Sequence, residues 1–448
     1  MHVAMVGTGY VGLVSGACLA AIGHRVVCVD SDAARIERLA RGQSPIHEDG
    51  LEPLIRDVQA AGRLDVTTEL AAALDRAQVI VVAVGTPNTE GRIDLSAVET
   101  ACRHIGAGLR GRRDFPVVAV KSTVIPGTTG TRVRRWLEDS SGGRAGREFG
   151  LAMNPEFLSQ GSAVADFLHP DRIVVGQLDQ ASGEVMAELY RPLPAPLLRM
   201  GLAEAEMVKY AANSLQAMLI SYANQIAALC EATPGTDARQ VMAAVHLDRM
   251  LDGPDGRRAG ATRFLMPGIG FGGSCFPKDL QALTIYAHRL GVPVPLVAAV
   301  SAVNAIRPAQ VLNLLASRLG GLYERHVTVL GLAFKPGTDD LRESPALSLI
   351  ERLRRHGAEV RTHDPLPQAR ARARDLGLPV CDTAEEALAG AHGAIIATAW
   401  PEYRALDWGA FGPLAVLDGR FLLDGLTLPA GLSVQQVGVS PLSPTVEE

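Results

Sequence analysis

The sequence predicts an α/β protein with two Rossmann-like domains, each a doubly wound parallel sheet, joined by a long central helix. In the N-terminal third, short strands that are apolar throughout alternate with helical patterns, which is typical of a parallel sheet covered on both faces. Residues 202–232 contain neither Gly nor Pro, as a long helix requires. The segment HVTVLG at 326–331 repeats the pattern of HVAMVG at 2–7, which indicates a second domain of the same kind.

The first domain begins with a strand at 2–6, and further apolar strands follow it along the N-terminal third. These further strand candidates are RVVCVD (25–30), VIVVAVG (79–85) and PVVAVKST (116–123). The segment 31–42 predicts a helix with Ser31 or Asp32 as its N-cap and Gly42 at its end.

The long helix at 202–232 is apolar on most sides, so we expect it to be buried between domains or subunits. An irregular loop is predicted at 249–262, where Gly, Asp and Arg are frequent. The second, smaller domain starts with a strand and a glycine turn at 325–340 and continues with apolar runs at 393–399 and 414–418.

The composition excludes several classes of protein. The 448 residues suggest about three domains of ordinary size. No run of Lys and Arg marks a nucleic-acid or membrane partner, and the formal net charge is −5. The six cysteines form no CxxC pair and no metal-ligand spacing, which predicts no metal site and reduced thiols. The N-terminus lacks the basic segment of a signal peptide and no uninterrupted membrane span follows, so we expect a soluble cytoplasmic protein.

The motif GTGYVG lies between an apolar strand and a helix, where it predicts a dinucleotide site. Gly7 permits the tight turn, Gly9 lets a pyrophosphate approach the backbone, and Gly12 lets the helix pack close to the strand. Asp30 ends the second strand, at the place of an acid that binds the ribose 2′-hydroxyl, and its charge favours NAD over NADP. Arg35 can serve the adenosine end of either cofactor.

Further stretches gather polar residues at predicted strand ends, and together they resemble one family. With GTGYVG they are similar to the UDP-glucose 6-dehydrogenase family, within the wider group that oxidises UDP- and GDP-sugars, and the similarity runs from residue 2 to about residue 420. The resemblance implies that a primary alcohol is oxidised to a carboxylate with two NAD+ per turnover and without release of the aldehyde. The stretches are VGTP (84–87), KSTVIPG (121–127), NPEFLSQGSAVADFLHPDRIVVG (154–176), GFGGSCFPKD (270–279) and FKPGTDDLRESPA (334–346).

Cys275 is the candidate nucleophile, because oxidation beyond the aldehyde requires a thiohemiacetal and then a thioester. Pro277 favours a helix start, which places Cys275 at the positive end of that helix. Lys278 adds a cation, and both effects lower the pKa of a thiol. Gly272 and Gly273 leave room for a substrate beside the backbone. Cys18, Cys28, Cys102, Cys230 and Cys381 are expected to be structural.

The resemblance also implies the roles of five further residues. Lys209 stabilises oxyanions at the reacting end of the sugar, with Asn213 one helical turn later. Asp279 and Thr123 hold a water that takes part in proton transfer, and Glu156 acts as a base. The alternatives are an ordinary salt bridge of Lys209 with Glu204, Glu206 or a neighbouring helix, and a helix-start carboxylate at Glu156.

The remaining site residues are implied by the same resemblance, with the site expected in the cleft between domains, where closure excludes water. For NAD, beside the glycines, Asp30 and Arg35, they are Tyr10, Val11, Thr86, Ser122, Thr123, Gln160, Lys278 and Arg342. For the nucleotide sugar, beside Glu156, Lys209 and Asn213, they are Phe157, Leu158, Gln160, Arg258, Phe264, Leu265, Met266, Pro267, Gly268, Gly272 and Lys335.

Two positions depart from the family pattern. Gln160 replaces a second glutamate of the NPEFL region, which moves more weight onto Glu156 as the base. The loop 249–262 is longer than usual in the family. The family has one arginine here that is often contributed across the subunit interface. Arg249, Arg257 and Arg258 are the candidates for this arginine, and Arg258 is favoured.

The resemblance divides the chain into four parts and implies a homodimer, or a higher homo-oligomer, through the central helix. They are an NAD-binding domain (1–200), a central helical and dimerisation region with the catalytic cysteine (201–315), a nucleotide-sugar-binding domain (316–435) and a tail (436–448). The final GVSPLSPTVEE (438–448) is expected to be disordered.

The expected substrate is UDP-glucose and the expected product is UDP-glucuronate, with alternatives in three classes. A sister enzyme would act on GDP-mannose or a UDP-hexosamine, because a few loop contacts decide which base is bound. A two-electron hydroxy-acid dehydrogenase shares the N-terminal architecture but has no use for Cys275. A non-catalytic NAD- or nucleotide-sugar-binding protein would not need Lys209, Glu156, Cys275 and Asp279 together.

Overall fold

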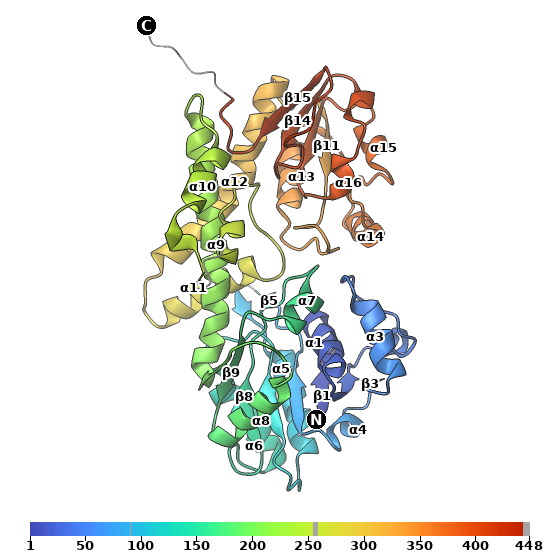
Figure 1. Cartoon of the computed structure of the whole chain (residues 1–448), viewed down its shortest axis with the longest axis vertical. Coiled ribbons are helices and arrows are strands. Elements are labelled where there is room, and N and C mark those ends of the chain that lie inside the picture. Colours follow the sequence, from blue (N-terminus) through green and yellow to red (C-terminus); the bar gives the residue numbers. More distant parts are fainter. Residues whose placement is uncertain (90, 254–258, 442–448) are drawn as a thin grey trace. The chain divides into compact units, whose positions relative to one another are not determined.

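The structure is a computed structural model that describes residues 1–89, 91–253 and 259–441 (Figure 1). Contacts between Cα atoms divide the chain into two compact units. The first unit is Met1–Ala212 with Gln281–Tyr286, and the second is Asn213–Leu280 with Ala287–Glu448. Each unit contains its own sheet and its own apolar core.

The first unit is built on a sheet of eight strands in the order β10-β9-β8-β7-β4-β1-β2-β3. Neighbouring strands run parallel except at one place, where β8 and β9 pair antiparallel. The strands are β1 (His2–Val6), β2 (Arg25–Val29), β3 (Leu64–Thr67), β4 (Val79–Val82), β7 (Val117–Val120), β8 (Gly150–Met153), β9 (Ile173–Gln177) and β10 (Leu197–Gly201). A separate antiparallel pair is formed by β5 (Asn88–Thr89) and β6 (Arg92–Ile93).

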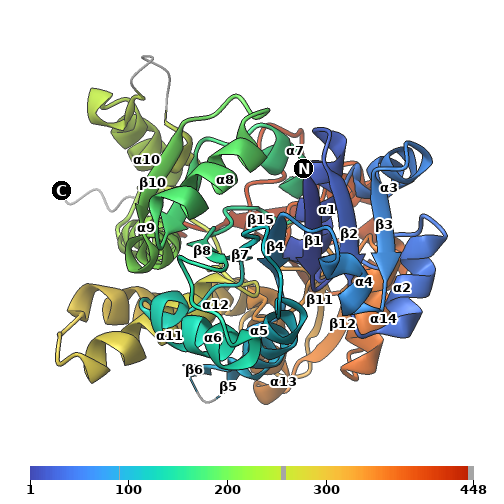
Figure 2. The same ribbon diagram turned by 90° about the horizontal axis from the view of Figure 1, so that it is seen from below.

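Helices cover both faces of this sheet, as apolar strands require. In β1, Val3 and Met5 belong to one buried apolar cluster, and Ala4 and Val6 belong to another. Figure 2 shows α1 and α8 on one side of the sheet, with α5 and α6 on the other. The helices are α1 (Tyr10–Ala21), α2 (Ala33–Ala40), α3 (Leu51–Ala60), α4 (Leu70–Leu74), α5 (Ser96–Gly108), η1 (Thr129–Val133), α6 (Arg134–Ser141), α7 (Ala163–Leu168) and α8 (Gln180–Tyr190).

The second unit contains a sheet of five parallel strands in the order β12-β11-β13-β14-β15. Its strands are β11 (His326–Leu330), β12 (Glu359–His363), β13 (Gly393–Ile396), β14 (Leu414–Asp418) and β15 (Leu432–Gln436). Ile395 of β13 faces one apolar cluster, while Ala394 and Ile396 face another. The helices are α10 (Ala238–His246), η2 (Arg249–Leu251), η3 (Gly260–Phe264), α12 (Pro295–Leu319), α13 (Pro345–Arg355), α14 (Pro367–Asp375), α15 (Ala384–Leu388), α16 (Pro401–Arg404) and η4 (Trp408–Phe411).

Two helices contain residues of both units: α9 (Leu202–Ala232) and α11 (Phe276–Arg289). Figure 1 shows α9 as one continuous helix. The predicted fold class, with two Rossmann-like parallel-sheet domains and a long central helix, is therefore confirmed. The predicted domain limits stay predictions.

Within the described ranges, α12 is the one helix long and apolar enough to cross a membrane, by length and composition alone. Core helices of soluble proteins pass the same test. At the middle of α12 the fully buried Arg307 forms an ion pair with Glu231 at 2.7 Å. Val311, Leu312 and Leu315 belong to the apolar core of the second unit. The C-terminal half of α12 is thus a core helix of that unit.

Most predicted elements agree with the structure to within a few residues. Asp32 is the N-cap of α2, where its Oδ1 accepts from the Arg35 N–H at 3.1 Å, and Gly42 follows with φ +71°. The loop 249–262 contains short 3₁₀ turns at both ends, and residues 254–258 lie outside the described residues.

The predicted disorder of the tail is wrong for its first residues. Gly438 N–H donates to Glu231 Oε1 at 2.6 Å, and Ser440 N–H donates to Thr236 O at 3.0 Å. The preceding Val437 is fully buried. The chain is therefore held in the second unit as far as residue 440, because Glu231 and Thr236 accept hydrogen bonds from its backbone. Residues 442–448 lie outside the described residues.

Candidate active site

The three glycines of the GTGYVG turn have separate structural reasons. Gly7 has φ +99° and its N–H donates to Val29 O at 2.8 Å. A Cβ on Gly12 would stand 1.9 Å from Gly7 O, so only glycine lets α1 pack here. A Cβ on Gly9 would meet nothing within 4 Å, at the N-terminus of α1. The space at Gly9 thus fits the pyrophosphate that the motif predicts, where helix N–H groups favour an anion.

Asp30 follows β2 and lies beside this turn. Its Oδ2 accepts from Thr8 N–H and Thr8 Oγ1, both at 2.8 Å, and pairs with Arg35 Nη1 at 3.2 Å. Burial alone would raise the pKa of Asp30, but hydrogen bonds from Thr8 and Asp32 and the charge of Arg35 hold it below its usual value. The carboxylate is therefore charged at neutral pH, which fits a ribose 2′-hydroxyl and disfavours a 2′-phosphate.

Other predicted cofactor residues follow the ends of neighbouring strands. Thr86 follows β4, and Ser122 and Thr123 follow β7, while the sheet order places β7, β4 and β1 side by side. Ser122 Oγ donates to Val84 O at 2.7 Å, which ties the two segments together. The structure thus brings these residues to the same sheet edge as the glycine turn, where ligands of such sheets bind.

Tyr10 and Val11 begin α1, and the Tyr10 hydroxyl donates to Glu48. Burial and this carboxylate raise the pKa of Tyr10 well above its ordinary value. Glu48 also accepts from Gly161 N–H and Ala163 N–H, both at 2.6 Å. Glu48 thereby links the glycine turn to the segment that follows β8, and sequence reasoning missed it because its partners are distant in sequence.

Glu156 and Lys209 form a buried ion pair, with Lys209 Nζ 2.8 Å from Glu156 Oε1. Glu156 Oε2 accepts from Leu158 N–H at 2.7 Å. Burial alone would raise the pKa of Glu156, but Lys209 and the Leu158 N–H hold it below its usual value. The structure thus pairs the predicted base with the predicted oxyanion-binding cation.

The other carboxylates weighed as partners of Lys209 have backbone partners. Glu206 accepts from Gly127 N–H at 2.5 Å and Thr129 N–H at 2.7 Å, and Glu204 accepts from Gly201 N–H at 2.7 Å. Both carboxylates therefore serve to hold neighbouring backbone.

A second buried lysine, Lys121, lies at the end of β7 and was not predicted as a site residue. Its Nζ donates to Asn154 Oδ1 at 2.9 Å. Burial lowers the pKa of Lys121 to about 8, with Lys209 acting in the same direction and Glu156 against it. A lysine that ends an otherwise apolar strand was the available signal in the sequence.

The half-buried Phe157 lies near two cations. Its ring centre is 4.2 Å from Arg172 Cζ and 5.7 Å from Lys209 Nζ, which suits a cation–π arrangement. Leu158 and Gln160 follow in the same segment and are also half-buried. Their contacts with substrate or cofactor stay predictions.

In the second unit, Cys275 immediately precedes α11, and its carbonyl accepts from Asp279 N–H at 2.8 Å. This confirms the predicted helix start. Cys275 and Cys381 are the two cysteines that are not fully buried. Burial raises the pKa values of Cys18, Cys28 and Cys102 to about 12, as expected for structural thiols.

Asp279 is buried and joins two other predicted residues. Asn213 Nδ2 donates to Asp279 Oδ2 at 2.6 Å, and Lys278 Nζ donates to Asp279 Oδ1 at 2.5 Å. The charge of Lys278 is therefore balanced by Asp279. The structure brings these three side chains together at the first turn of α11, next to Cys275 in the chain.

The reason given for Gly272 and Gly273 needs correction. A Cβ on Gly272 would stand 2.1 Å from Glu343 O, and one on Gly273 would stand 2.9 Å from the Phe334 ring. Gly273 N–H also donates to Arg342 O at 3.0 Å. The chain itself fills this space, so packing requires the glycines, and contact of the Gly272 backbone with substrate stays a prediction.

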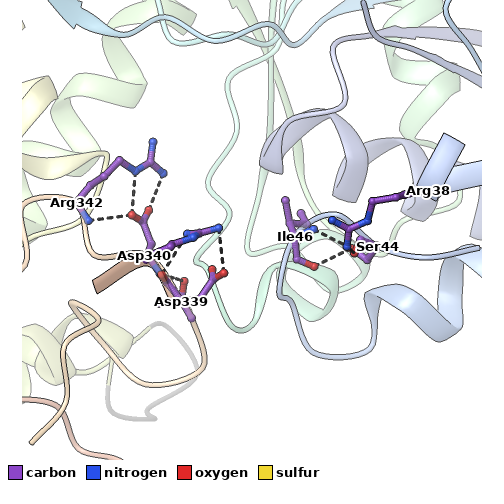
Figure 3. A network of polar contacts seen from close by, with 8 residues as sticks. Arg38, Ser44, Ile46, Asp339, Asp340 and Arg342 are labelled. Atoms are coloured by element: carbon purple, nitrogen blue, oxygen red, sulfur yellow. Dashed lines mark hydrogen bonds and ion pairs between the residues drawn. The ribbon is translucent and has the colours of Figure 1, made fainter. Parts of the chain in front are cut away.

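Arg342 pairs with Asp340 through Nε at 2.8 Å and Nη2 at 2.6 Å (Figure 3). The hydrogen bonds to Asp340 raise the pKa of Arg342. Arg372 holds Asp339 at 3.0 Å, so two neighbouring carboxylates fix this segment of the second unit. Lys335 lies in the same segment and is half-buried.

The predicted sugar-binding segment Phe264–Gly268 is fixed by buried side chains. Gly268 N–H donates to Asn224 Oδ1 at 2.8 Å, and Gly268 O accepts from Arg307 Nε at 2.9 Å. Leu265, Pro267 and Gly268 are buried, Phe264 is half-buried and Met266 is exposed. Arg257 and Arg258 lie outside the described residues.

Three domains of one family match this chain in order. The NAD-binding domain of the UDP-glucose/GDP-mannose dehydrogenase family matches residues 1–194, its central domain matches 203–306, and its UDP-binding domain matches 328–428.

Individual relatives are similar over nearly the whole chain. A UDP-glucose 6-dehydrogenase of Haloferax volcanii is 41% identical over 94% of this chain and 96% of its own. A GDP-mannose 6-dehydrogenase of Pseudomonas aeruginosa is 40% identical over 81% of each. The structure of a UDP-glucose dehydrogenase from Pyrobaculum islandicum matches with a TM-score of 0.89 and 39% identity over 98% of both chains. The chain therefore belongs to the UDP-glucose/GDP-mannose dehydrogenase family of NAD-dependent oxidoreductases.

Proposed function

We propose that this enzyme oxidises UDP-glucose to UDP-glucuronate by way of a thioester on Cys275. The observation that carries this proposal is the position of Cys275 at the N-terminus of α11, whose first turn carries Asp279, hydrogen-bonded to the buried Asn213 and to the half-buried Lys278. A helix N-terminus favours a thiolate, which is the form that attacks an aldehyde.

The overall reaction consumes the alcohol, one water and two NAD+, and it yields the acid, two NADH and two protons. When bound, NAD+ accepts the hydride in each oxidation; the turn at Gly9 would hold its pyrophosphate and Asp30 its adenosine ribose. The Cys275 sulfur adds to the aldehyde carbon to give a thiohemiacetal. After the second oxidation, water attacks the thioester carbon, the carbon–sulfur bond breaks and the thiol is regenerated.

Glu156 and Lys209 supply the charges that hydrolysis requires. The carboxylate of Glu156 takes a proton from the attacking water, and its lowered pKa keeps it ionised at neutral pH. The ammonium of Lys209 stabilises the oxyanion that forms. Asp279 and Thr123 hold the water of the first proton transfer, with Asn213 orienting Asp279.

The helix α9 contains residues of both groups. Lys209 lies in the first part of α9 and pairs with Glu156, and Asn213 follows it four residues later and donates to Asp279. Phe264–Gly268, Gly272 and Lys335 bind the nucleotide sugar, with Phe157 and Leu158. The residues that contribute to cofactor binding are Thr86, Ser122, Gln160, Lys278 and Arg342.

The decisive experiment counts NADH per nucleotide sugar consumed. We expect two NADH per UDP-glucose, with UDP-glucuronate as the product identified by mass spectrometry. A ratio of one with an accumulating aldehyde, or no NADH with any nucleotide sugar, would contradict the proposal.

GDP-mannose is the second candidate substrate, because a relative named for it is 40% identical over 81% of this chain, against 41% over 94% for one named for UDP-glucose. The same assay with UDP-glucose, GDP-mannose and a UDP-hexosamine separates the candidates. A kcat/KM higher for GDP-mannose than for UDP-glucose would overturn the assignment of the sugar.

The enzyme works in the cytoplasm as a homodimer through α9. Three large apolar side chains of α9 are exposed: Leu215 by 51%, Tyr222 by 49% and Leu229 by 65%. They lie seven residues apart and so form one stripe along the helix. A seven-residue repeat of this kind is the pattern by which one helix packs against another. A second copy of the chain would cover this stripe.

A further inference from the structure

Lys121 is a buried cation for which the proposed reaction has no task so far. It follows β7, and only 4% of its surface is exposed. Its Nζ donates to Asn154 Oδ1 at 2.9 Å. Lysine is almost never fully buried unless it is paired, so a neutral amide as hydrogen-bond partner calls for a further reason.

The orientation of Asn154 is fixed by its other hydrogen bonds. Its Nδ2 donates to Val174 O at 2.8 Å in β9, and its N–H donates to Val120 O at 2.8 Å in β7. Its Oδ1 also accepts from Tyr190 Oη at 2.5 Å. The amide oxygen therefore faces Lys121, and the cation holds the start of the segment that carries Glu156 two residues later.

The titratable groups around Lys121 come from three segments. They are Glu156 after β8, Lys209 in α9 and Tyr190 in α8, and the Phe167 ring centre lies 6.0 Å from Lys121 Nζ. Burial raises the pKa of Tyr190, so its hydroxyl stays neutral. The group thus contains two cations and one carboxylate, and Glu156 is within electrostatic range of both lysines.

The surplus cation matters when Lys209 acts on the substrate. In the structure Lys209 neutralises Glu156 at 2.8 Å. Once the Lys209 ammonium turns to an oxyanion on the substrate, the carboxylate loses its partner and would become protonated, because burial favours the neutral form. A second, fixed cation prevents this and keeps the base ionised.

We infer that Lys121 is the positioning residue of the Glu156 base: it anchors the Asn154–Glu156 segment and supplies the positive charge that remains when Lys209 engages the substrate. The inference rests on the proposed role of Glu156 in thioester hydrolysis. A residue with only a packing role would need no charge, so a long apolar side chain could replace it.

The test compares Lys121→Met, which keeps the length but not the charge, with Lys121→Arg, which keeps the charge. For Lys121→Met we expect kcat to fall about tenfold and KM for the sugar to stay nearly unchanged. The fall is smaller than the roughly 10²–10⁴-fold that a positioned base contributes, because the base itself remains. The acid limb of the kcat–pH profile should move to higher pH, because loss of a nearby cation raises the pKa of a carboxyl group. Lys121→Arg should keep most of the wild-type kcat and should leave the acid limb of the kcat–pH profile near its wild-type position.

Mass spectrometry of the enzyme during turnover adds a direct reading. A covalent adduct on Cys275 should accumulate in Lys121→Met and not in the wild type, because only hydrolysis is slowed. The inference would be overturned if Lys121→Met kept the wild-type kcat and pH profile and only its melting temperature fell. Lys121 would then have a packing role.

Hydrogen exchange separates a failure of this inference from a failure of the proposed function. If the wild type oxidises no nucleotide sugar, the proposed function fails, yet amide exchange of peptides covering 154–162 still reports on the anchor. Faster exchange there in Lys121→Met, with protection kept in Lys121→Arg, supports the anchoring part. Unchanged exchange in both variants contradicts it. The same measurement shows whether Lys121→Met folds poorly, because exchange would then be faster throughout the chain.

Discussion

At the scale of single residues, Cys275 differs from the other cysteines in its surroundings. It is partly exposed at the start of α11, whereas Cys18, Cys28, Cys102 and Cys230 are buried in the cores. A thiol at a helix N-terminus is stabilised as the thiolate, and a thiol in an apolar core is not. We therefore expect the reactive thiol at Cys275, since the other partly exposed cysteine, Cys381, does not immediately precede a helix.

Replacement of Cys275 by serine should uncouple the two oxidations. Net formation of the acid should fall by more than about 10³-fold, because no thioester can form. Some first oxidation should remain, and hydroxylamine should trap the aldehyde. The matched control is Cys381→Ser, which changes the other partly exposed cysteine and should keep wild-type turnover. Unchanged uronate formation in Cys275→Ser would refute the thioester route.

Asp30→Ala should weaken NAD+ binding and reduce the preference of the enzyme for NAD+ over NADP+. The carboxylate is charged and held by Thr8 and Arg35, and loss of a hydrogen bond to a charged group costs about 1.5–3 kcal/mol, or roughly 10–100-fold in affinity. The measurement is KM for both cofactors. Asp32→Ala is the control, since this residue caps α2 and should cost only about 1 kcal/mol of stability. An unchanged ratio of the two KM values would contradict the assignment of Asp30.

At the scale of elements, short apolar strands made the sheets predictable, because each strand buries both faces. The antiparallel pairing of β8 and β9 had no comparable signal, since an apolar strand reads the same in either direction. Glu48 and Lys121 were missed for a related reason: their partners lie 113 and 33 residues away, and only the fold brings them together.

The exposed stripe on α9 predicts which substitution should disrupt the proposed dimer. Tyr222→Glu would place an unpaired carboxylate among apolar side chains, which costs several kcal/mol, so the dimer should weaken by at least about 100-fold. Light scattering after size-exclusion chromatography at micromolar concentration measures this. Leu376→Glu, at an apolar side chain that is 60% exposed elsewhere in the second unit, should leave the mass unchanged. A dimer that survives Tyr222→Glu would rule out this interface.

The buried pair of Arg307 and Glu231 predicts a coupled loss of stability and substrate binding. Glu231 holds both Arg307 and Gly438, and Arg307 in turn holds Gly268. Glu231→Gln leaves a buried cation unpaired and should cost about 3–5 kcal/mol, with a higher KM for the sugar and little change in KM for NAD+. Thermal unfolding and steady-state kinetics test both effects. Equal changes in the two KM values would show that the effect is global.

At the scale of the whole molecule, the chain repeats one design. Gly331 N–H donates to His363 O at 2.8 Å as Gly7 N–H donates to Val29 O, and the acids Asp364 and Asp30 follow the corresponding strands. Asp364 is fully buried and its oxygens accept from Leu332, Ala333 and Leu366 N–H groups. The second sheet thus has no exposed acid at this place for a ribose, and the repeated HVxxxG pattern alone could not show this.

Because NAD+ is expected at the glycine turn of the first sheet and UDP at residues 262–269 and 331–336 of the second unit, each ligand alone should protect its own segments. NAD+ alone should slow amide exchange in peptides covering 7–13 and 28–36, and UDP alone should slow it in peptides covering 262–269 and 331–336. Ligand at about 100 times its Kd stabilises the bound state by roughly 2.7 kcal/mol, enough to lower exchange through local opening about 100-fold. Asp30→Ala should remove the first effect and leave the second. Protection of the peptides covering 262–269 and 331–336 by NAD+ alone would contradict this division of binding.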